Sequence, residues 1–275
     1  MTREDANCRE PEGRGPSETP ALEARGLTVA WGDGTPVVQG IDLAVSEGET
    51  VCLVGKSGMG KTTLLHALAG LTMPRMGKVL LHGRDVTGQP GRVSYMLQKD
   101  LLLPGLRVID NACLPLTLSG MSKSEARKTA RPLLARFGLE EAADKWPSQL
   151  SGGMRQRAAF LRTCLMGNDV VMLDEPFSAL DAITRVDVRT WFRNQARDMG
   201  LSTLMITHDA DEACIMADRI YVLGRASEPD GGNAPAVVVG QVVPDRNACG
   251  QLGEYSLTPA FLQAKARVLD LLTSG

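Results

Sequence analysis

Residues 51–63 have the sequence Val-Cys-Leu-Val-Gly-Lys-Ser-Gly-Met-Gly-Lys-Thr-Thr. The first four are apolar and rich in β-branched residues, which predicts a short buried strand. The next positions match the phosphate-binding pattern G-x-x-x-x-G-K-[ST] through Gly55, Gly60, Lys61 and Thr62. An apolar helical pattern follows directly. A strand, a glycine-rich loop and a helix in this order predict a site for a nucleoside triphosphate.

Each residue type in this loop has a physical reason to be there. Gly58 and Gly60 allow backbone conformations that a side chain forbids, so successive N–H groups can surround an anion. The helix that begins near Lys61 adds the positive end of its dipole. The Lys61 ammonium adds a full charge, worth roughly 4 kcal/mol at 4 Å with an effective dielectric constant of 20. The hydroxyl of Thr62 suits Mg²⁺.

A second apolar strand ends in two carboxylates. Residues 170–175 have the sequence Val-Val-Met-Leu-Asp-Glu. Open parallel sheets place ligands at the carboxyl ends of their strands. We therefore expect Asp174 to bind Mg²⁺ through a water, and Glu175 to act as a base that polarises the attacking water. The alternative is a buried strand that ends in a solvated acidic turn.

A second glycine-rich helix start lies shortly before Asp174. Residues 150–157 have the sequence Leu-Ser-Gly-Gly-Met-Arg-Gln-Arg. A hydroxyl and two glycines at a helix start can bind an anion. Taken alone, this stretch is best explained as an ordinary helix N-cap. Its position 18–24 residues before Asp174 favours the anion-binding interpretation instead.

Composition limits the class of protein. The chain has 275 residues, enough for one large domain or two small ones. A net charge of −2 argues against non-specific nucleic-acid binding. Six cysteines without C-x-x-C spacing predict a reducing compartment, with neither a zinc site nor a disulfide framework. We find no signal-peptide pattern and no apolar run of 18 residues, which predicts a soluble cytoplasmic protein.

Local patterns predict strands that alternate with helices, with one helical interruption. Strands are expected at 22–29, 37–45, 79–81, 93–97, 169–174, 202–207, 220–223 and 237–243. Residues 101–168 carry helical patterns, and later helices are expected at 182–198, 210–217 and 258–272. This order predicts an α/β core with an inserted helical subdomain.

Two helices in the inserted region have local signals, and one turn is marked as well. The first is expected from Ser122 to Phe137, because Ser122 and Glu125 form a capping-box pattern. Its expected apolar stripe consists of Leu133, Leu134 and Phe137. The second is expected over 152–166. Residues 83–85, Gly-Arg-Asp, predict a turn after the strand at 79–81.

Over about residues 22–225 the sequence resembles the ATP-binding subunits of ABC transporters. Six motifs match in the family order, namely Gly55 to Thr62 (Walker A), Gln98 (Q-loop), Leu150 to Met154 (signature), Val170 to Glu175 (Walker B), Ser178 to Asp181 (D-loop) and His208 (switch histidine). The signature distinguishes this family from other P-loop proteins such as kinases and GTPases, because those proteins lack it. One departure is Met154, where many family members have glutamine.

The resemblance implies a P-loop NTPase (RecA-like) α/β core with an antiparallel β edge and an inserted α-helical subdomain, of the ABC ATPase type. We expect residues 1–20, which are charged and proline-rich, to form a disordered tail. The remaining expected boundaries are an ABC ATPase domain at 21–245, with its core at 21–98 and 169–225 and its helical subdomain at 99–168, and a C-terminal helical extension at 246–275.

The resemblance also implies how ATP is held. Two copies close head to tail over two ATP molecules, and Ser151, Gly152 and Gly153 of one copy bind the γ-phosphate held by the other. Within one copy the expected nucleotide-binding residues are Trp31, Gly55, Lys56, Ser57, Gly58, Met59, Gly60, Lys61, Thr62 and Thr63. Trp31 would stack on adenine, for roughly 1–3 kcal/mol; its alternative is an ordinary surface or core tryptophan.

For catalysis the resemblance implies Glu175, His208, Lys61 and Gln98. The metal ligands it implies for Mg²⁺ are Thr62, Gln98 and Asp174. Asp181 would lie at the interface between the two copies. His66 and His82 match no motif, and we expect both to be structural.

Residues 99–111, Lys-Asp-Leu-Leu-Leu-Pro-Gly-Leu-Arg-Val-Ile-Asp-Asn, place several leucines in a loop, where water disfavours them. Such a loop either packs on its own helices or docks a partner. In the family this segment lines the groove that receives a coupling helix of the permease. Its sequence is similar to that of importers for nitrate, sulfonate, taurine and pyrimidine precursors.

The expected function is therefore ATP hydrolysis that powers transport across a membrane, with ATP and Mg²⁺ as cofactors. Expected partners are a second copy, an integral-membrane permease and a separate substrate-binding protein, with no nucleic acid. The expected location is the cytoplasmic face of the inner (plasma) membrane, peripheral through the permease. The alternatives are another importer class, an exporter ATPase, and a stand-alone ABC-type ATPase in DNA maintenance or on the ribosome.

Overall fold

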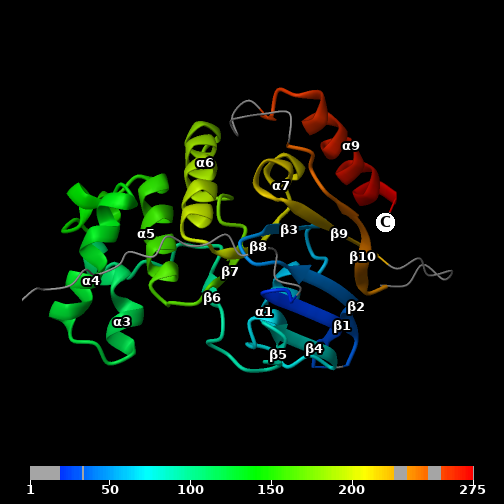
Figure 1. Ribbon diagram of the computed structural model, residues 1–275, viewed down its shortest axis with the longest axis horizontal. Helices are drawn as coiled ribbons and strands as arrows, with labels where there is room; N and C mark the ends of the chain where they lie inside the picture. The colour runs from blue at the N-terminus through cyan, green and yellow to red at the C-terminus, as the bar shows by residue number, and fades with distance from the viewer. Residues whose placement is uncertain (1–18, 33, 226–233, 247–254, 275) are drawn as a thin grey trace, which may run out of the picture.

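Figure 1 shows the computed structural model, which describes residues 19–32, 34–225, 234–246 and 255–274. Within these residues the fold is built on one ten-stranded mixed sheet, with strand order β5-β4-β1-β2-β10-β9-β3-β8-β7-β6. The tail expected at 1–20 lies outside the described residues except for its last two positions.

The strands follow the predicted positions closely. They are β1 (Leu22–Ala30), β2 (Pro36–Val45), β3 (Thr50–Val54), β4 (Met76–Leu81), β5 (Arg84–Asp85), β6 (Ser94–Met96), β7 (Val170–Asp174), β8 (Ser202–Thr207), β9 (Arg219–Arg225) and β10 (Ala236–Val242). β5 differs from the prediction: residues 84 and 85, expected in a turn, pair with β4 as a short hairpin strand.

The helices also occur where periodicity predicted them, and two short 3₁₀ turns are added to them. They are α1 (Lys61–Leu68), α2 (Val108–Ala112), α3 (Leu114–Leu118), α4 (Lys123–Arg136), α5 (Gly152–Cys164), α6 (Ala182–Asp198), α7 (Ala210–Met216) and α9 (Pro259–Ser274), with single 3₁₀ turns at Glu140–Ala142 and Pro147–Gln149. None of the described helices is long and apolar enough to cross a membrane.

The centre of the sheet is parallel and buried on both faces. β3 pairs in parallel with β8 and β9, and β7 pairs in parallel with β6 and β8. Every residue of β3, β7 and β8 is buried, as the continuous apolar runs predict. Alternate residues of β3 enter different cores: Val51 and Leu53 pack with α1, whereas Cys52 and Val54 pack with α5, α6 and α7.

One edge of the sheet is antiparallel, which confirms the expected β edge. β1 pairs antiparallel with β2 and β4, and β4 pairs antiparallel with β5. Figure 1 shows these strands on the opposite side of the molecule from the green helices α3, α4 and α5. The antiparallel edge thus covers α1, while the helices between β6 and β7 form a separate layer beyond the last strand.

Helix α4 confirms its capping box but not its predicted stripe. The Ser122 hydroxyl accepts from the backbone N–H of Glu125, and the Glu125 carboxylate accepts from the backbone N–H of Ser122. The buried face of α4 consists of Ala126, Ala130 and Leu134, and Phe137 is buried after the helix ends. Leu133, expected in the stripe, is only half-buried.

The C-terminal helix α9 packs on the rest of the fold, as its amphipathic pattern predicted. It lies against α7 and the strands β9 and β10. Its buried residues are Phe261, Ala264 and Val268. The adjacent strand β10 joins β9 antiparallel and touches β2 in parallel, so it links the parallel centre of the sheet to the antiparallel edge.

Candidate active site

The phosphate loop connects β3 to α1 and needs its glycines for two reasons. Gly58 and Gly60 have φ angles of 79° and 81°, in the left-handed region that other residues avoid. A Cβ atom on Gly60 would also lie 2.4 Å from Cγ1 of Val37. Gly60 is the N-cap of α1 and has no side chain to cap the helix, so the N–H groups of the first turn stay available to an anion.

Lys61 is folded over its own loop. Its Nζ donates to the carbonyl oxygens of Gly55 at 2.8 Å and Lys56 at 3.2 Å, and only 6% of the residue is exposed. Burial lowers the pKa of the Lys61 ammonium, while the nearby carboxylates of Glu175 and Asp174 raise it. The lysine therefore holds the loop closed and presents its charge at the place where phosphates would bind.

Two cavities meet at the loop and share Trp31, Val37 and Gly58 as lining residues. The smaller, of about 310 Å³, is also lined by Lys61 and Glu175. The larger, of about 510 Å³, extends toward β10, and its lining also includes Pro36, Met59 and Ala236. Trp31 lies between the two with 65% of its surface exposed. A polar cavity beside a larger one with an open aromatic ring suits a triphosphate joined to a nucleoside.

Asp174, at the end of β7, lies beside the start of α1. Its Oδ1 accepts from the Thr62 hydroxyl at 3.4 Å, and its Oδ2 accepts from the Tyr95 hydroxyl at 3.2 Å. Burial raises the pKa of the Asp174 carboxyl, and the two hydrogen bonds lower it. The structure thus brings together Thr62 and Asp174, two of the three residues that we predicted as Mg²⁺ ligands.

Tyr95 is a site residue that the sequence analysis missed. It lies on β6, whose parallel pairing with β7 places Tyr95 opposite Met172, two residues before Asp174. Burial and the adjacent carboxylate raise the pKa of the Tyr95 phenol, so it stays a hydrogen-bond donor. Its ring also meets the ring of His66 edge to face at 5.8 Å, which gives His66 the structural role that we expected.

Glu175 is the meeting point of the predicted catalytic residues. Its Oε2 accepts from Nε2 of Gln98 at 3.2 Å and lies 3.1 Å from Nδ1 of His208. Gln98, Glu175 and His208 follow β6, β7 and β8, three neighbouring parallel strands. Glu175 has a φ of 42°, a left-handed conformation that costs a non-glycine residue roughly 1–3 kcal/mol and is typical of functional sites.

The donors around the phosphate loop fit Mg²⁺. Thr62 and Asp174 offer a hydroxyl and a carboxylate oxygen, and Gln98 offers an amide oxygen. Hard oxygen ligands of this kind suit Mg²⁺, which is usually held by one or two protein ligands plus phosphates and waters. No group of three or more His, Cys, Asp or Glu side chains in the described ranges could hold a metal ion alone.

The signature residues lie at a different helix start. Ser151 is the N-cap of α5, and its Oγ accepts from the backbone N–H of Met154 at 3.3 Å. A Cβ atom on Gly153 would lie 3.0 Å from the Thr184 side chain, so this glycine allows α5 to pack closely on α6. Neither Ser151 nor Gly153 lines the two cavities at the phosphate loop. A single chain does not bring the signature to its own Lys61.

Asp181 and His82 have structural contacts. Asp181 is the N-cap of α6, where its Oδ1 accepts from the backbone N–H of Thr184 at 3.0 Å. These hydrogen bonds lower the pKa of the Asp181 carboxyl. His82, expected to be structural, lies 2.7 Å from Asp169 through Nε2.

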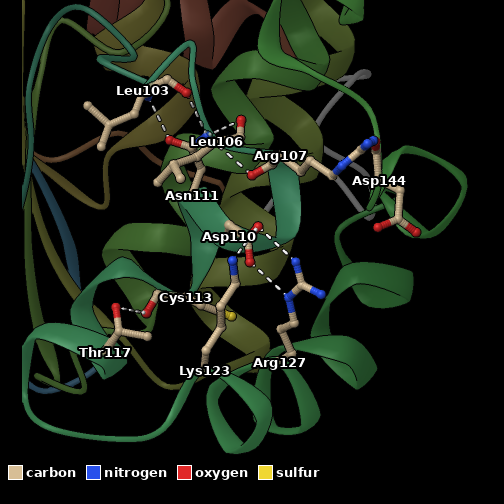
Figure 2. A network of polar contacts seen from close by, with 10 residues as sticks. All are labelled: Leu103, Leu106, Arg107, Asp110, Asn111, Cys113, Thr117, Lys123, Arg127 and Asp144. Carbon is tan, nitrogen blue, oxygen red and sulfur yellow. Dashed lines mark hydrogen bonds and ion pairs between the residues drawn. The ribbon is translucent and has the colours of Figure 1, made fainter.

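The loop after Gln98 is held by a buried amide, as Figure 2 shows. The fully buried Asn111 donates from Nδ2 to the carbonyl oxygens of Leu103, Leu106 and Arg107, and its Oδ1 accepts from the Leu103 N–H at 2.7 Å. Half of the Leu101 side chain and nearly half of the Leu103 side chain nevertheless stay exposed. The loop is therefore packed on its own helix and still presents leucines at the surface.

Comparison with known proteins decides the family. The family model described as "ABC transporter" matches residues 38–178, slightly more than half of the chain. This chain belongs to the ABC transporter family. Membership makes it an ATP-binding protein and an ATP hydrolase coupled to transport. The resemblance and the P-loop NTPase fold stated from the sequence are confirmed.

Curated relatives of this ABC transporter chain are import proteins. It is 37% identical over 196 residues to the formylaminopyrimidine import ATP-binding protein ThiZ of Halalkalibacterium halodurans, a match that covers 71% of this chain and 76% of that protein. It is 42% identical over 211 residues to the aliphatic sulfonates import ATP-binding protein SsuB 2 of Streptomyces avermitilis, covering 75% and 78%.

A solved structure gives the same result for the fold. The dimeric post-hydrolysis state of the ATP-binding cassette MJ0796, bound to ADP and Pi, superimposes with a TM-score of 0.66. The match covers 81% of this chain and 98% of that cassette at 27% sequence identity.

Proposed function

We propose that this ABC transporter chain is the ATP-binding and ATP-hydrolysing subunit of an importer, and that it powers transport through a separate integral-membrane permease. One observation carries the hydrolytic part: Gln98, Glu175 and His208 converge on one carboxylate oxygen beside the phosphate loop. The relatives named above support import of a sulfonate or a pyrimidine precursor, and together with the resemblance of residues 99–111 they lead us to propose a substrate of the nitrate, sulfonate, taurine or pyrimidine-precursor type.

In this proposal the nucleotide spans the two cavities that share Trp31. Trp31 stacks on the base, and its open ring face supports that role. The phosphates lie over the N–H groups of the loop from Gly55 to Thr63. Lys61 exchanges its contacts with the carbonyls of Gly55 and Lys56 for the β- and γ-phosphates, because a phosphate is a stronger partner for an ammonium than a carbonyl.

The metal ligands in this proposal are Thr62, Gln98 and Asp174. Mg²⁺, when bound, neutralises the charge that develops on the transferred phosphoryl group. Tyr95 orients the Asp174 carboxylate by donating to Oδ2, and this leaves Oδ1 facing Thr62. The hydrogen bonds to Asp174 favour its ionised form, which is the form that binds a hard cation.

Glu175 acts as the base that orients the attacking water. Its Oε2 is held by Gln98 and His208, which fixes the carboxylate in one orientation. Nδ1 of His208 donates to Glu175, and the opposite ring nitrogen can donate to the γ-phosphate when it also carries a proton. The left-handed backbone of Glu175 aims this side chain at the loop rather than along β7. Fixed orientation of this kind is the main contribution of a protein to phosphoryl transfer.

A second copy completes each site in this proposal. Ser151, Gly152 and Gly153 begin a helix whose N-terminus suits an anion, but they line neither cavity of their own chain. A head-to-tail dimer places them over the γ-phosphate of the other chain, and Asp181 at the interface. The dimeric cassette named above supports this arrangement.

The remaining partners follow from the importer proposal. The exposed side chains of Leu101 and Leu103 dock the permease. A separate substrate-binding protein delivers the substrate to the permease. The chain then lies peripherally at the cytoplasmic face of the inner (plasma) membrane. An exporter ATPase and a stand-alone ATPase are the alternatives that transport assays with the cognate permease would reveal.

The test is the substitution Glu175→Gln, which keeps the shape of the side chain and removes the base. We expect ATP hydrolysis to fall by about 10²-fold or more, because general-base catalysis contributes that much. We also expect Mg²⁺ and ATP to hold the variant as a dimer of twice the mass, measured by light scattering. The matched control is Glu141→Gln, which makes the same change at an exposed glutamate in the 3₁₀ turn Glu140–Ala142. This variant should behave as wild type.

Two results would contradict the proposal. Normal hydrolysis by Glu175→Gln would remove Glu175 as the base. An inactive variant that binds ATP and stays monomeric, even with the permease present, would remove the dimeric site.

A further inference from the structure

A third cavity, of about 300 Å³, lies between α6, α7 and the start of α9. Figure 1 shows these three helices together on one side of the molecule. None of the residues that line it belongs to the nucleotide site. Its polar lining includes Arg189, Thr190 and Asp211, and its apolar lining consists of Val186, Ile215 and Phe261.

Arg189 is the unusual member of this lining. Only 9% of the residue is exposed, and its Nε is fully buried without a hydrogen-bond partner in the part of the chain that the structure describes. Moving a guanidinium from water into the protein interior costs free energy. Buried polar atoms in native proteins are nearly always hydrogen-bonded. Arg189 itself lines the cavity, so the part of its guanidinium beyond the buried Nε can reach a molecule that is bound there.

The acidic groups around Arg189 are engaged elsewhere. Asp211 pairs with Nζ of Lys265 at 2.6 Å, which raises the pKa of that lysine. Glu212 is buried and accepts from the Thr207 hydroxyl, and burial raises the pKa of the Glu212 carboxyl although Arg189 and Arg185 oppose this. Neither carboxylate is hydrogen-bonded to Nε of Arg189. The cavity thus offers a cationic group that its own neighbours leave incompletely matched.

We propose that this cavity binds a small organic carboxylate, with its head group on Arg189 and a short aliphatic tail against Val186, Ile215 and Phe261. The planar guanidinium fork matches a carboxylate, and a pocket with one charged anchor and an apolar wall is typical of small-molecule sites. The volume is at the lower end for small-molecule sites and has room for a carboxylate with a short aliphatic tail.

The site's position makes the ligand an effector of ATP hydrolysis. α6 begins at its N-cap Asp181, in the D-loop, and α7 begins directly after His208. A molecule bound in this cavity contacts both α6 and α7, and these two helices begin at Asp181 and just after His208. Binding there changes the hydrolysis rate only through differential affinity for the open and closed arrangements, so occupancy and rate should change together.

The binding test uses butyrate as the probe and butyramide as its uncharged counterpart of equal shape. We expect saturable binding of butyrate in ligand-observed NMR, and binding of butyramide at least about tenfold weaker, since a charge-assisted pair is lost. Arg189→Met should weaken butyrate by about the same factor. The matched control is Arg197→Met on the same helix, which should bind butyrate as wild type.

Four results would overturn the proposal: no saturable butyrate binding up to about 50 mM, equal binding of butyrate and butyramide, unchanged binding by Arg189→Met, or a wild-type ATPase rate that butyrate does not alter. Should Arg189→Met not fold, Arg189→Lys keeps the charge without the fork, and we expect it to bind butyrate more weakly than wild type. Because NMR reports binding directly, the three binding results do not depend on ATP hydrolysis or on the proposed transport function, and only the rate measurement does.

Discussion

The starts of helices α1 and α5 are both built from glycines, yet they differ in how complete they are. At α1, Gly60 leaves the first-turn N–H groups uncapped, and Lys61 folds over the loop. At α5, the Ser151 hydroxyl already accepts from the Met154 N–H. The difference teaches that a helix N-terminus becomes a nucleotide site only where the sheet delivers the remaining groups.

The surroundings of the two helix starts explain that difference. Beside α1 lies the end of β7, which brings Asp174 next to Thr62 and Glu175 to the loop. Beside α5 lie side chains of the D-loop and α6. Their nearest atoms to the signature glycines are the methyl carbons of Leu180, Thr184 and Val188. We therefore expect α1 to bind nucleotide in any single chain and α5 to act only on a second chain.

The largest effect is expected from Lys61→Ala at the complete site. Removing a charge aimed at the reacting phosphate typically costs 10²–10³-fold, so we expect kcat/KM to fall by roughly that factor. The loop also loses its two closing hydrogen bonds, so nucleotide affinity should fall with it. Lys78→Ala, which removes an exposed lysine that pairs with Asp85, is the control and should leave both quantities unchanged.

A smaller effect is expected from Ser151→Ala at the incomplete site. Hydrolysis should slow by about tenfold through loss of one hydrogen bond to a charged phosphate, while ATP binding to the monomer stays at the wild-type level. Ser122→Ala is the matched control, because it removes an equivalent N-cap bond of 3.3 Å from α4. Both variants should lose about 1 kcal/mol of folding stability. Equal hydrolysis by the two would make Ser151 a cap and nothing more.

Mixing the two impaired variants tests whether the sites are shared. In an equal mixture of Lys61→Ala and Ser151→Ala, half of the dimers are mixed and each holds one intact site, so about a quarter of wild-type activity should return. The measurement is ATP hydrolysis before and after mixing at fixed total protein. Activity that stays at the average of the two separate variants would show that each chain works alone.

The smallest effect is expected from Tyr95→Phe, which refines the complete site. The Tyr95 hydroxyl lowers the pKa of Asp174, so its removal raises that pKa further. Asp174 must be ionised to bind Mg²⁺, so the acid limb of the pH profile of kcat/KM should move to higher pH by up to about one unit. Tyr221→Phe, whose hydroxyl bonds to the backbone of Ala44, is the control. Superimposable profiles would remove this role.

The sequence predicted the strand positions and the six motifs, but it could not predict how the strands pair. Tyr95 became a site residue only because β6 pairs in parallel with β7. Nothing local to positions 93–97 indicates that neighbour. The left-handed backbone of Glu175 is equally invisible in sequence, because a glutamate gives no signal for a positive φ.

The remaining errors have local physical causes. Residues 84 and 85 are polar and suggested a turn, but backbone pairing with β4 makes them a strand regardless of side chain. In α4 the largest apolar residues were expected to form the buried face. The helix instead buries the small residues Ala126 and Ala130, which allow close approach, and leaves Leu133 half-buried. The cavity beside Arg189 depends on three helices distant in sequence, so no motif indicates it.

The shared oxygen of Glu175 has a consequence for how this chain can evolve. Gln98, Glu175 and His208 each follow a different strand, so their meeting depends on the register in which β6, β7 and β8 are hydrogen-bonded. A one-residue insertion or deletion within any of these strands would displace one partner by about 3.3 Å and turn its neighbours to the opposite face. Lineages of this protein should therefore accumulate length changes outside these strands. A length change within one of them should abolish ATP hydrolysis before it abolishes folding.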